Sequence, residues 1–370
     1  MTHLPPMPPS PPMPGPGSRK KRWIVPVVAL VALGLLGWPI LHYLGVFSDK
    51  GDPVSFAQAN KGGGKQGGGA DGQAGGQSGE ESRTLMPTGP EAKFTVESTL
   101  GDGTKIAKTK YQGQKSGFTG NVWVWAPKEY YEKQYEKSGF PVLIALPGGD
   151  GAQTNYWIGG DLALQANIST WVKEGKSLPF VVVMPTLNPN RKFYYDGSDI
   201  PDQPKMGTWL TEDVPDLVKA NFRTLKSRDG WAFMGSSSGG FAGLKAVLKH
   251  PDKFKAVIAS GPDIVPDSPL WKGHEQEKAE NNPKVLAQRL IDAKGPDVYL
   301  AFQYGTAEDP LTISQVDQFR SQYDKGPVHT MLKKIPGGKH NARTYVPGLG
   351  QGPMEWISKQ MEGPTPAPAS

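Results

Sequence analysis

Three consecutive serines flanked by glycines, in the string AFMGSSSGGFAG at residues 232–243, are the first candidates for chemistry in this chain. Such a string is either a flexible Gly/Ser tether or a turn that presents a nucleophilic hydroxyl. A strand pattern, GWAFM, precedes the serines, and a helix pattern, GGFAGLKAVLKH, follows them. Residues 235–239 fit G-x-S-x-G in the strand–turn–helix context that holds a serine nucleophile on a strained turn. The pattern therefore predicts that Ser237 is a nucleophile.

The register of the motif also predicts where an oxyanion would be stabilised. Centring the motif on Ser238 would put Ser236 where the first glycine belongs, so this register is the weaker one. A tetrahedral intermediate needs one N–H donor from the residue after the nucleophile and one from a loop after an earlier strand. We therefore expect an oxyanion hole from the backbone of Ser238 and of Gly149, which lies in LIALPGGDGAQ. No G-K-[ST] follows these glycines, which argues against a phosphate-binding loop.

A serine hydroxyl needs a base, and four histidines follow Ser237 in the chain. His250 ends a predicted helix, where a histidine is explained by capping. His329 falls in the predicted strand VHTMLKKI, and His274 falls in an irregular insertion. His340 lies in IPGGKHNART, a Gly-rich loop beyond the end of a strand, where α/β sheets place functional residues. We predict that His340 is the base.

The acid that orients the histidine should follow the strand DVYLAFQYG. Asp309 is the first choice because it comes late in the turn GTAEDP, and Glu308 and Asp317 are alternatives. The chain contains no cysteine, which excludes disulfides, a thiolate nucleophile and cysteine-ligated metals. A serine mechanism of this kind requires no metal and no cofactor.

Short apolar runs alternate with helix patterns, which predicts one doubly wound α/β domain on a mostly parallel sheet. Strands are expected near residues 93–100, 121–127, 140–147, 178–185, 230–235, 254–261, 297–305 and 328–335, with the first two as an antiparallel edge pair. Helices are expected over 162–174, 208–222, 240–250, 284–293, 313–323 and 352–361. The insertion at 263–282 either shapes the substrate pocket or covers the sheet edge.

The N-terminal quarter of the chain has the composition of a membrane anchor that is followed by a flexible linker. Residues 1–22 form a Pro-rich tail with a basic cluster, which could bind a Pro-recognising partner. Residues 23–47 carry no formal charge and are long enough for one transmembrane helix, with the basic side in the cytoplasm. A cleaved signal peptide is the rival interpretation. Residues 48–90 read as a Gly-rich linker, 91–361 as an extracellular catalytic domain and 362–370 as a loose tail.

The net charge of +6 gives no support to nucleic-acid binding, because residues 19–22 supply four of the positive charges. The expected partners are the membrane and an ester substrate that is a small molecule or a cell-envelope component.

Several of these segments together resemble the esterase D family of α/β hydrolases, which includes S-formylglutathione hydrolases, feruloyl and siderophore esterases, and mycolyltransferases. The segments are NVWVWAP, LIALPGGDG, TWLTEDVPDLVKANF, the elbow with its helix, VYLAFQYGTAED and IPGGKH, over about residues 94–361. The resemblance implies an α/β-hydrolase fold, with Ser237 as nucleophile, His340 as base, and Gly149 with Ser238 as oxyanion hole. The loop PGGDGAQTNYW is similar to that of mycolyltransferases, whose acid position would favour Asp317.

The predicted function is therefore hydrolysis of a carboxylic ester through an acyl-enzyme. Acyl transfer to a sugar or another alcohol would use the same residues. The sequence departs from the mycolyltransferases after the histidine, where HNARTYVPGLG replaces a Trp-rich segment. A catalytically silent binding domain is the alternative from another class, and a serine peptidase ranks last.

Overall fold

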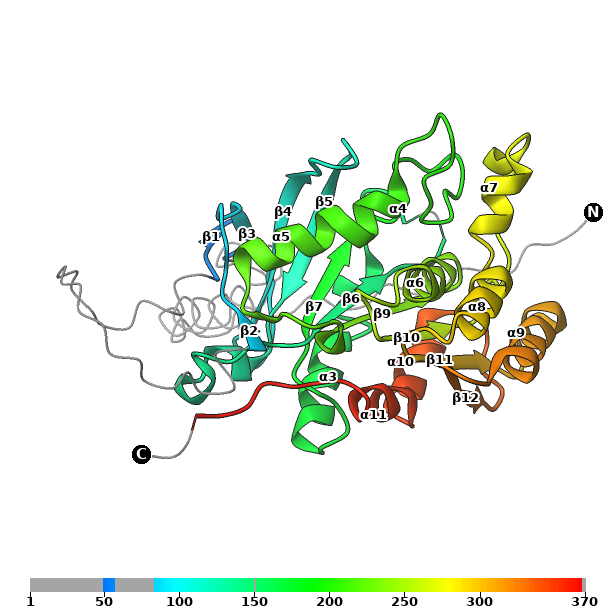
Figure 1. The fold of residues 1–370 in the computed structure, drawn as a ribbon. Helices are drawn as coiled ribbons and strands as arrows, with labels where there is room; N and C mark the ends of the chain where they lie inside the picture. The colour runs from blue at the N-terminus through cyan, green and yellow to red at the C-terminus, as the bar shows by residue number, and fades with distance from the viewer. Residues whose placement is uncertain (1–48, 57–82, 150, 368–370) are drawn as a thin grey trace, which may run out of the picture. The chain divides into compact units, whose positions relative to one another are not determined.

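The computed structural model describes residues 49–56, 83–149 and 151–367. The described residues from Lys50 onward belong to one compact unit. Its centre is a ten-stranded sheet in the order β1-β3-β4-β5-β7-β6-β9-β10-β11-β12 (Figure 1). The strands from β7 to β12 run parallel, and the edge from β1 to β5 is antiparallel. The mostly parallel sheet predicted from the sequence is thus confirmed.

The central strands are short apolar runs that are buried on both faces, as parallel strands covered by helices should be. They are β6 (Val142–Leu146), β7 (Val181–Pro185), β9 (Trp231–Ser236), β10 (Ala256–Ser260) and β11 (Val298–Gly305). The last parallel strand, β12 (Val328–Ile335), forms the edge of the sheet and is mostly only half-buried. The antiparallel edge consists of β1 (Pro53–Val54), β3 (Phe94–Thr99), β4 (Lys105–Gln112) and β5 (Thr119–Trp125). A separate pair joins β2 (Thr84–Leu85) to β8 (Thr224–Leu225).

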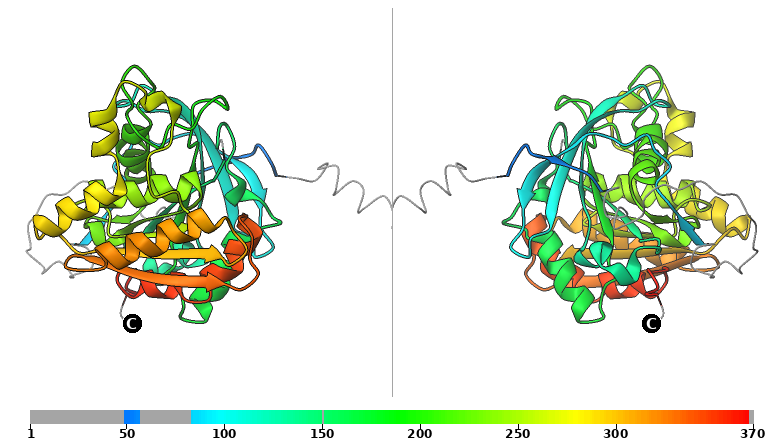
Figure 2. Two further views of the ribbon diagram at one scale, coloured as in Figure 1. Left: turned by 90° about the vertical axis from the view of Figure 1, so that its right-hand side faces the viewer. Right: turned by 90° about the vertical axis from the view of Figure 1, so that its left-hand side faces the viewer.

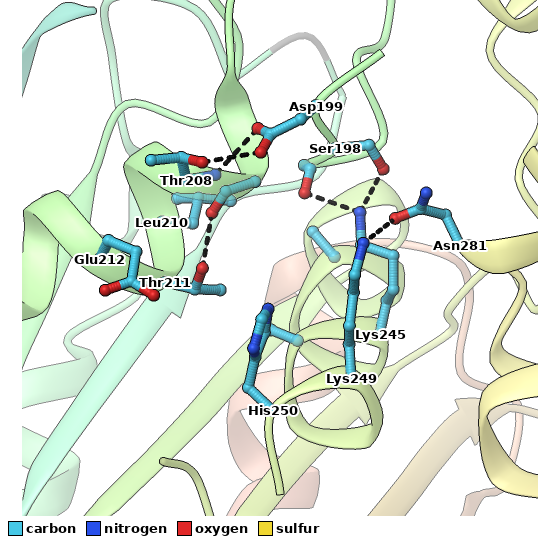
Figure 3. Close-up of a pocket in the computed structure, with 14 residues that line it drawn as sticks. Ser198, Asp199, Thr208, Leu210, Thr211, Glu212, Lys245, Lys249, His250 and Asn281 are labelled. Carbon is cyan, nitrogen blue, oxygen red and sulfur yellow. Dashed lines mark hydrogen bonds between the residues drawn. The ribbon is translucent and has the colours of Figure 1, made fainter. Parts of the chain in front are cut away.

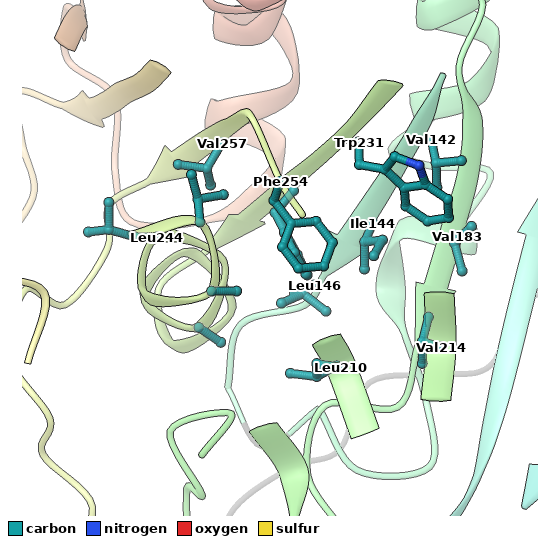
Figure 4. Close-up of a cluster of buried hydrophobic side chains, with 14 of the residues drawn as sticks. Val142, Ile144, Leu146, Val183, Leu210, Val214, Trp231, Leu244, Phe254 and Val257 are labelled. Atoms are coloured by element: carbon teal, nitrogen blue, oxygen red, sulfur yellow. The ribbon is translucent and has the colours of Figure 1, made fainter. Parts of the chain in front are cut away.

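Helices cover both faces of the sheet (Figure 2). One core cluster packs the sheet against α5 (Val214–Asn221), α6 (Ser238–Lys249), α8 (Pro283–Asp292) and α9 (Pro310–Tyr323). Figure 4 shows part of this cluster, with Leu244 of α6 on the side of Val257 in β10 and Val214 of α5 on the side of Val183 in β7. The other cluster packs the sheet against α3 (Leu164–Lys173), α10 (Ala342–Leu349) and α11 (Pro353–Ser358). Two short helices, α4 (Met206–Thr208) and α7 (Glu275–Glu280), complete the α-helices among the described residues.

The predicted edge pair needs a correction, because β3 and β5 do not pair with each other. Both strands pair with β4, at residues 105–112, which lies between them in the sheet. The segment KIAKTKYQ has three lysines, at positions 105, 108 and 110, and therefore lacks the dense apolar run by which the other strands were recognised. The helices α7 and α10 were also not predicted.

The predicted boundaries at both ends of the catalytic domain also change. The predicted linker over 48–90 contains β1 and β2, and Phe56 within it is buried in the core. At the other end, the predicted tail contacts the domain, since the hydroxyl of Ser138 donates to the carbonyl of Thr365 at 2.5 Å. The amide of Ala367 donates to the carbonyl of Gln134 at 2.7 Å. The folded domain therefore begins before residue 91 and extends past residue 361.

The proposed anchor at 23–47 and the Pro-rich tail at 1–22 lie outside the described residues. Among the residues that are described, no helix is both long and apolar enough to cross a membrane.

Candidate active site

The serine string forms the predicted turn between β9, which ends at Ser236, and α6, which begins at Ser238. Ser237 has φ 53° and ψ −126°, a strained backbone conformation for a residue with a side chain. The flanking glycines make this turn possible. A Cβ on Gly235 would lie 2.5 Å from the carbonyl oxygen of Gly239, and a Cβ on Gly239 would lie 2.6 Å from that of Leu146. The string is therefore a tight elbow rather than a tether.

The carboxylate that contacts His340 belongs to Glu308. Glu308 Oε2 lies 2.7 Å from His340 Nδ1, and the glutamate side chain is fully buried. Its other oxygen accepts the backbone N–H of Gly305 at 2.5 Å, which fixes the carboxylate at the end of β11. This hydrogen bond to Glu308 raises the pKa of His340 above its ordinary value, against the opposing effect of burial. The arrangement stabilises an imidazolium, as a base in acyl transfer requires.

The other two candidate acids have structural contacts, so the first choice of Asp309 is not the carboxylate beside the histidine. Asp309 is the N-cap of α9, where its side chain accepts the backbone N–H of Leu311 at 2.8 Å. Asp317 accepts the hydroxyl of Tyr304 at 2.9 Å, on a different part of that helix. Because α9 starts directly after Asp309, the Asp309 side chain caps this helix, and the side chain of its neighbour Glu308 contacts His340.

A tyrosine and a glycine complete the surroundings of the acid–base pair. The hydroxyl of Tyr345 lies 2.9 Å from His340 Nδ1, and its pKa is raised by burial and by the nearby Glu308 carboxylate. Gly261, which follows β10, has φ +51° and packs against the pair. A Cβ at Gly261 would lie 2.6 Å from Glu308 Oε2 and 2.9 Å from His340 Nδ1. Only a glycine leaves room for this contact.

Ser237 and His340 line the same pocket, which has a volume of about 570 Å³. Gly149, the predicted oxyanion donor, lines it as well and has φ +68°. Ser238 is the first residue of α6, so its N–H lies at the positive end of the helix dipole. The hydroxyl of Ser238 donates to the carbonyl of Gly149 at 3.0 Å, which links the two predicted halves of the oxyanion hole. The remaining lining residues are Gly148, Tyr156, Asp161, Leu162, Tyr194, Ser236, Asn341, Ala342, Arg343 and Tyr345.

The other histidines have different surroundings. His329 contacts Asp297 at 2.8 Å and stacks on Tyr299 with 4.9 Å between the ring centroids. His274 precedes the short helix α7. His250 lines a separate cavity of about 120 Å³ beside α6 (Figure 3), and burial lowers its pKa. The described part of the chain has no group of three or more histidine, aspartate and glutamate side chains that could hold a metal ion.

Sequence reasoning missed several residues of this pocket. Tyr156 follows the predicted oxyanion loop, and Tyr345 follows His340 by five positions. Arg343 and Asp161 form an exposed ion pair of 2.7 Å at the pocket. The aromatic residues lay in segments already singled out for Gly149 and His340. Their role was not visible because no motif sets a spacing for them.

An elbow serine and a histidine that share one pocket, with a buried glutamate hydrogen-bonded to the histidine, define a serine hydrolase of the α/β-hydrolase type on this doubly wound sheet. Residues 116–349 match the esterase family described as "Putative esterase". This match covers more than half of the chain, and the chain therefore belongs to that family. Together, the family and the site identify a serine ester hydrolase.

Individual relatives are distant. An uncharacterized protein of Corynebacterium glutamicum is 21% identical over 298 residues, which cover 76% of this chain and 66% of that protein. Among solved structures, a ferulic acid esterase has a TM-score of 0.57 at 18% identity, covering 70% of this chain and 99% of its own. An S-formylglutathione hydrolase from Agrobacterium tumefaciens has a TM-score of 0.56 at 19% identity, covering 72% and 99%. At these identities the solved structures show a shared fold.

Proposed function

We propose that this protein hydrolyses a carboxylic ester through an acyl-enzyme on Ser237. The observation that carries the proposal is the 2.7 Å contact between Glu308 and His340, in a pocket that also holds the strained elbow serine. His340 takes the proton of Ser237 as its oxygen attacks the ester carbonyl carbon. Glu308 orients the imidazole and stabilises its positive charge.

The attack forms a tetrahedral intermediate, which then collapses to the acyl-enzyme. Electrons of the carbonyl π bond move to its oxygen during the attack, and the N–H groups of Ser238 and Gly149 stabilise that oxyanion. When the electrons return, the bond to the alcohol breaks, and the alcohol leaves with the proton carried by His340. Water repeats the sequence on the acyl-enzyme and releases the acid.

Acyl transfer to a sugar or another alcohol is the second candidate. It is supported by the Asp161–Arg343 ion pair at the pocket, which offers hydrogen-bonding groups to a hydroxyl-rich acceptor. Product analysis with and without an added alcohol separates the two outcomes, since only a transferase forms a new ester while water is in excess.

We also propose, from the sequence, that residues 23–47 anchor the chain in the cell membrane with the catalytic domain outside. The cytoplasmic Pro-rich tail would then be free to bind a partner domain. Protease protection of intact cells, followed through a tag at each end, tests this orientation.

The catalytic proposal is tested by incubating the purified full-length chain with a fluorophosphonate and locating the adduct by mass spectrometry. We expect labelling at Ser237 that is lost in Ser237→Ala and in His340→Ala. An Asp317→Asn protein should label normally and serves as the control. A folded wild-type protein that is not labelled would instead favour a silent domain that only binds its ligand.

A further inference from the structure

Tyr156 lies between the two halves of the oxyanion site. It opens a short 3-10 helix, Tyr156–Ile158, in the segment that follows the loop after β6. Its hydroxyl oxygen accepts the backbone N–H of Gly148 at 2.5 Å and is hydrogen-bonded to the hydroxyl of Ser236. Gly148 belongs to the loop after β6, and Ser236 belongs to the nucleophile elbow. One phenol therefore contacts both of the elements that form the oxyanion hole.

The same hydroxyl is close to the nucleophile. A Cβ built on Gly148 would lie 3.2 Å from the Tyr156 hydroxyl oxygen and 3.1 Å from the Cβ of Ser237. Both Tyr156 and Ser237 line the 570 Å³ pocket. An acyl group on the serine would therefore have its carbonyl in the neighbourhood of the phenol.

The O–H group of Tyr156 remains available as a hydrogen-bond donor to a group in the pocket. A tyrosine hydroxyl has two acceptor positions and one donor. Gly148 fills one acceptor position, and Ser236 fills the other when its hydroxyl is the donor. Burial raises the pKa of Tyr156, so the phenol keeps its proton at neutral pH. The N–H of Gly148 also polarises the phenol and makes it a better donor.

We propose that Tyr156 is a catalytic residue that donates a hydrogen bond to the oxyanion of the tetrahedral intermediate, beside Ser238 and Gly149. This inference rests on the proposed acyl-enzyme function. No proton is transferred from the phenol: the carbonyl π electrons move to oxygen as Ser237 adds, and the phenol O–H points at the resulting charge. The N–H of Gly148 acts on the oxyanion through Tyr156, because it is already bonded to the phenol oxygen.

The experiment compares Tyr156→Phe with Ser236→Ala in the full-length chain. The first variant removes the phenol oxygen, whereas the second removes only the link to the elbow and leaves the phenol on Gly148. Turnover of p-nitrophenyl acetate gives kcat and KM. The inhibition constant of an aryl trifluoromethyl ketone, which adds to the serine as a hemiketal oxyanion, reports oxyanion stabilisation separately from substrate binding.

We expect Tyr156→Phe to lower kcat by about 100- to 1,000-fold, the range for loss of one oxyanion donor. KM should change little, and the ketone should bind more weakly by a similar factor. Ser236→Ala should lose much less in both measurements. Equal losses in the two variants, with no further loss in the double variant, would mean that Tyr156 only ties the loop to the elbow, and would overturn the proposal.

The remaining outcomes are also decisive. An active wild type together with an unchanged Tyr156→Phe protein overturns this inference alone, whereas a wild type that the ketone does not inhibit overturns the proposed function as well. Should Tyr156→Phe fail to fold, 3-fluorotyrosine at position 156 replaces it. A more acidic phenol should tighten ketone binding at unchanged KM, and unchanged ketone binding would contradict a donor role.

Discussion

At the scale of single residues, the Glu308–His340 contact predicts how activity depends on pH. The base works only when neutral, and Glu308 raises the pKa of His340 above 6.5, so kcat/KM should rise with pH through a midpoint above that value. In Glu308→Gln the charge is lost and the midpoint should move to lower pH. We also expect kcat to fall by about 10²- to 10⁴-fold, because the imidazolium loses its stabilising anion.

The matched control for this change is the neighbouring carboxylate. Asp309→Asn keeps an N-cap for α9, since asparagine caps as well as aspartate does. Its pH profile and kcat should match those of the wild type. A profile that shifts in Asp309→Asn but not in Glu308→Gln would return the role of the acid to the residue that the sequence favoured.

The acid illustrates what the sequence could and could not predict at this scale. Ser237 and His340 were predicted because each stands at a recognisable junction between a strand and a loop or helix. The choice between Glu308 and Asp309 depends on which residue begins α9, and two adjacent acidic residues before a proline leave that open. Tyr156 was missed for a similar reason, because its role comes from contacts between segments 80 residues apart.

At the scale of elements, a buried lysine joins α6 to the segment over 194–198 (Figure 3). The Nζ of Lys245 donates to the carbonyls of Asp196 and Gly197 at 2.5 and 2.6 Å, and to the hydroxyl of Ser198. The insertion over 263–282 is fastened to the same segment, because the indole of Trp271 donates to the Asp196 carboxylate at 2.6 Å.

These hydrogen bonds place the insertion next to a segment that lines the 570 Å³ pocket. None of its residues is among those that line the described pocket, but Tyr194 is, and Ser268 donates from its hydroxyl to the Tyr194 carbonyl at 2.5 Å. The insertion therefore contacts the segment that carries Tyr194, and the carboxylate of its first residue, Asp263, also helps to raise the pKa of His340.

Lys245 should make the stability of the domain depend on pH. Burial lowers the pKa of Lys245 to about 7, from 10.5. Between these values the unfolded chain binds more protons than the native one, so the free energy of unfolding should rise with pH in this window. In Lys245→Met this rise is absent. Urea unfolding at about pH 7.5 and about pH 9.5 should show the wild type gaining roughly 2 kcal/mol over the variant.

A second lysine on the same helix provides the control. Lys249 is exposed and donates to the side chain of Asn281 at 3.0 Å. Lys249→Met leaves Lys245 unchanged. The free energy of unfolding of this variant should therefore rise with pH by the same amount as that of the wild type. If Lys245→Met also ran parallel to the wild type, Lys245 would not be a buried group that loses its proton in this range.

At the scale of the whole molecule, the folded domain includes a piece of chain that composition assigned to a linker. The apolar runs of the central strands were long enough to be predicted, but residues 49–56 contain only the short stretch PVSF beside a Gly-rich segment. The structure pairs Pro53 and Val54 with β3 and buries Phe56 to 2% exposure. Because this strand pairs with a segment far away in the sequence, the pairing could not be predicted from the composition of residues 49–56.

Phe56 should therefore contribute to the stability of the catalytic domain from outside its predicted boundary. Its ring packs against Phe222 with 4.5 Å between centroids and edge-on against Phe94 at 5.3 Å. Phe56→Ala should lower the free energy of unfolding by about 3–5 kcal/mol, as for a phenylalanine removed from a core. Leu311→Ala, at a side chain that is 62% exposed, should change it by less than about 0.5 kcal/mol.

The same packing predicts how truncated chains behave. A chain that begins at residue 49 keeps β1 and Phe56, whereas one that begins at residue 83 loses both, and one that begins at residue 91 also loses β2. Thermal unfolding should rank the three in that order, and the largest step should separate the first from the second because Phe56 is lost there. Equal stability of the first two would show that residues 49–56 are dispensable, and the catalytic domain would then begin after the Gly-rich segment, as composition alone suggested.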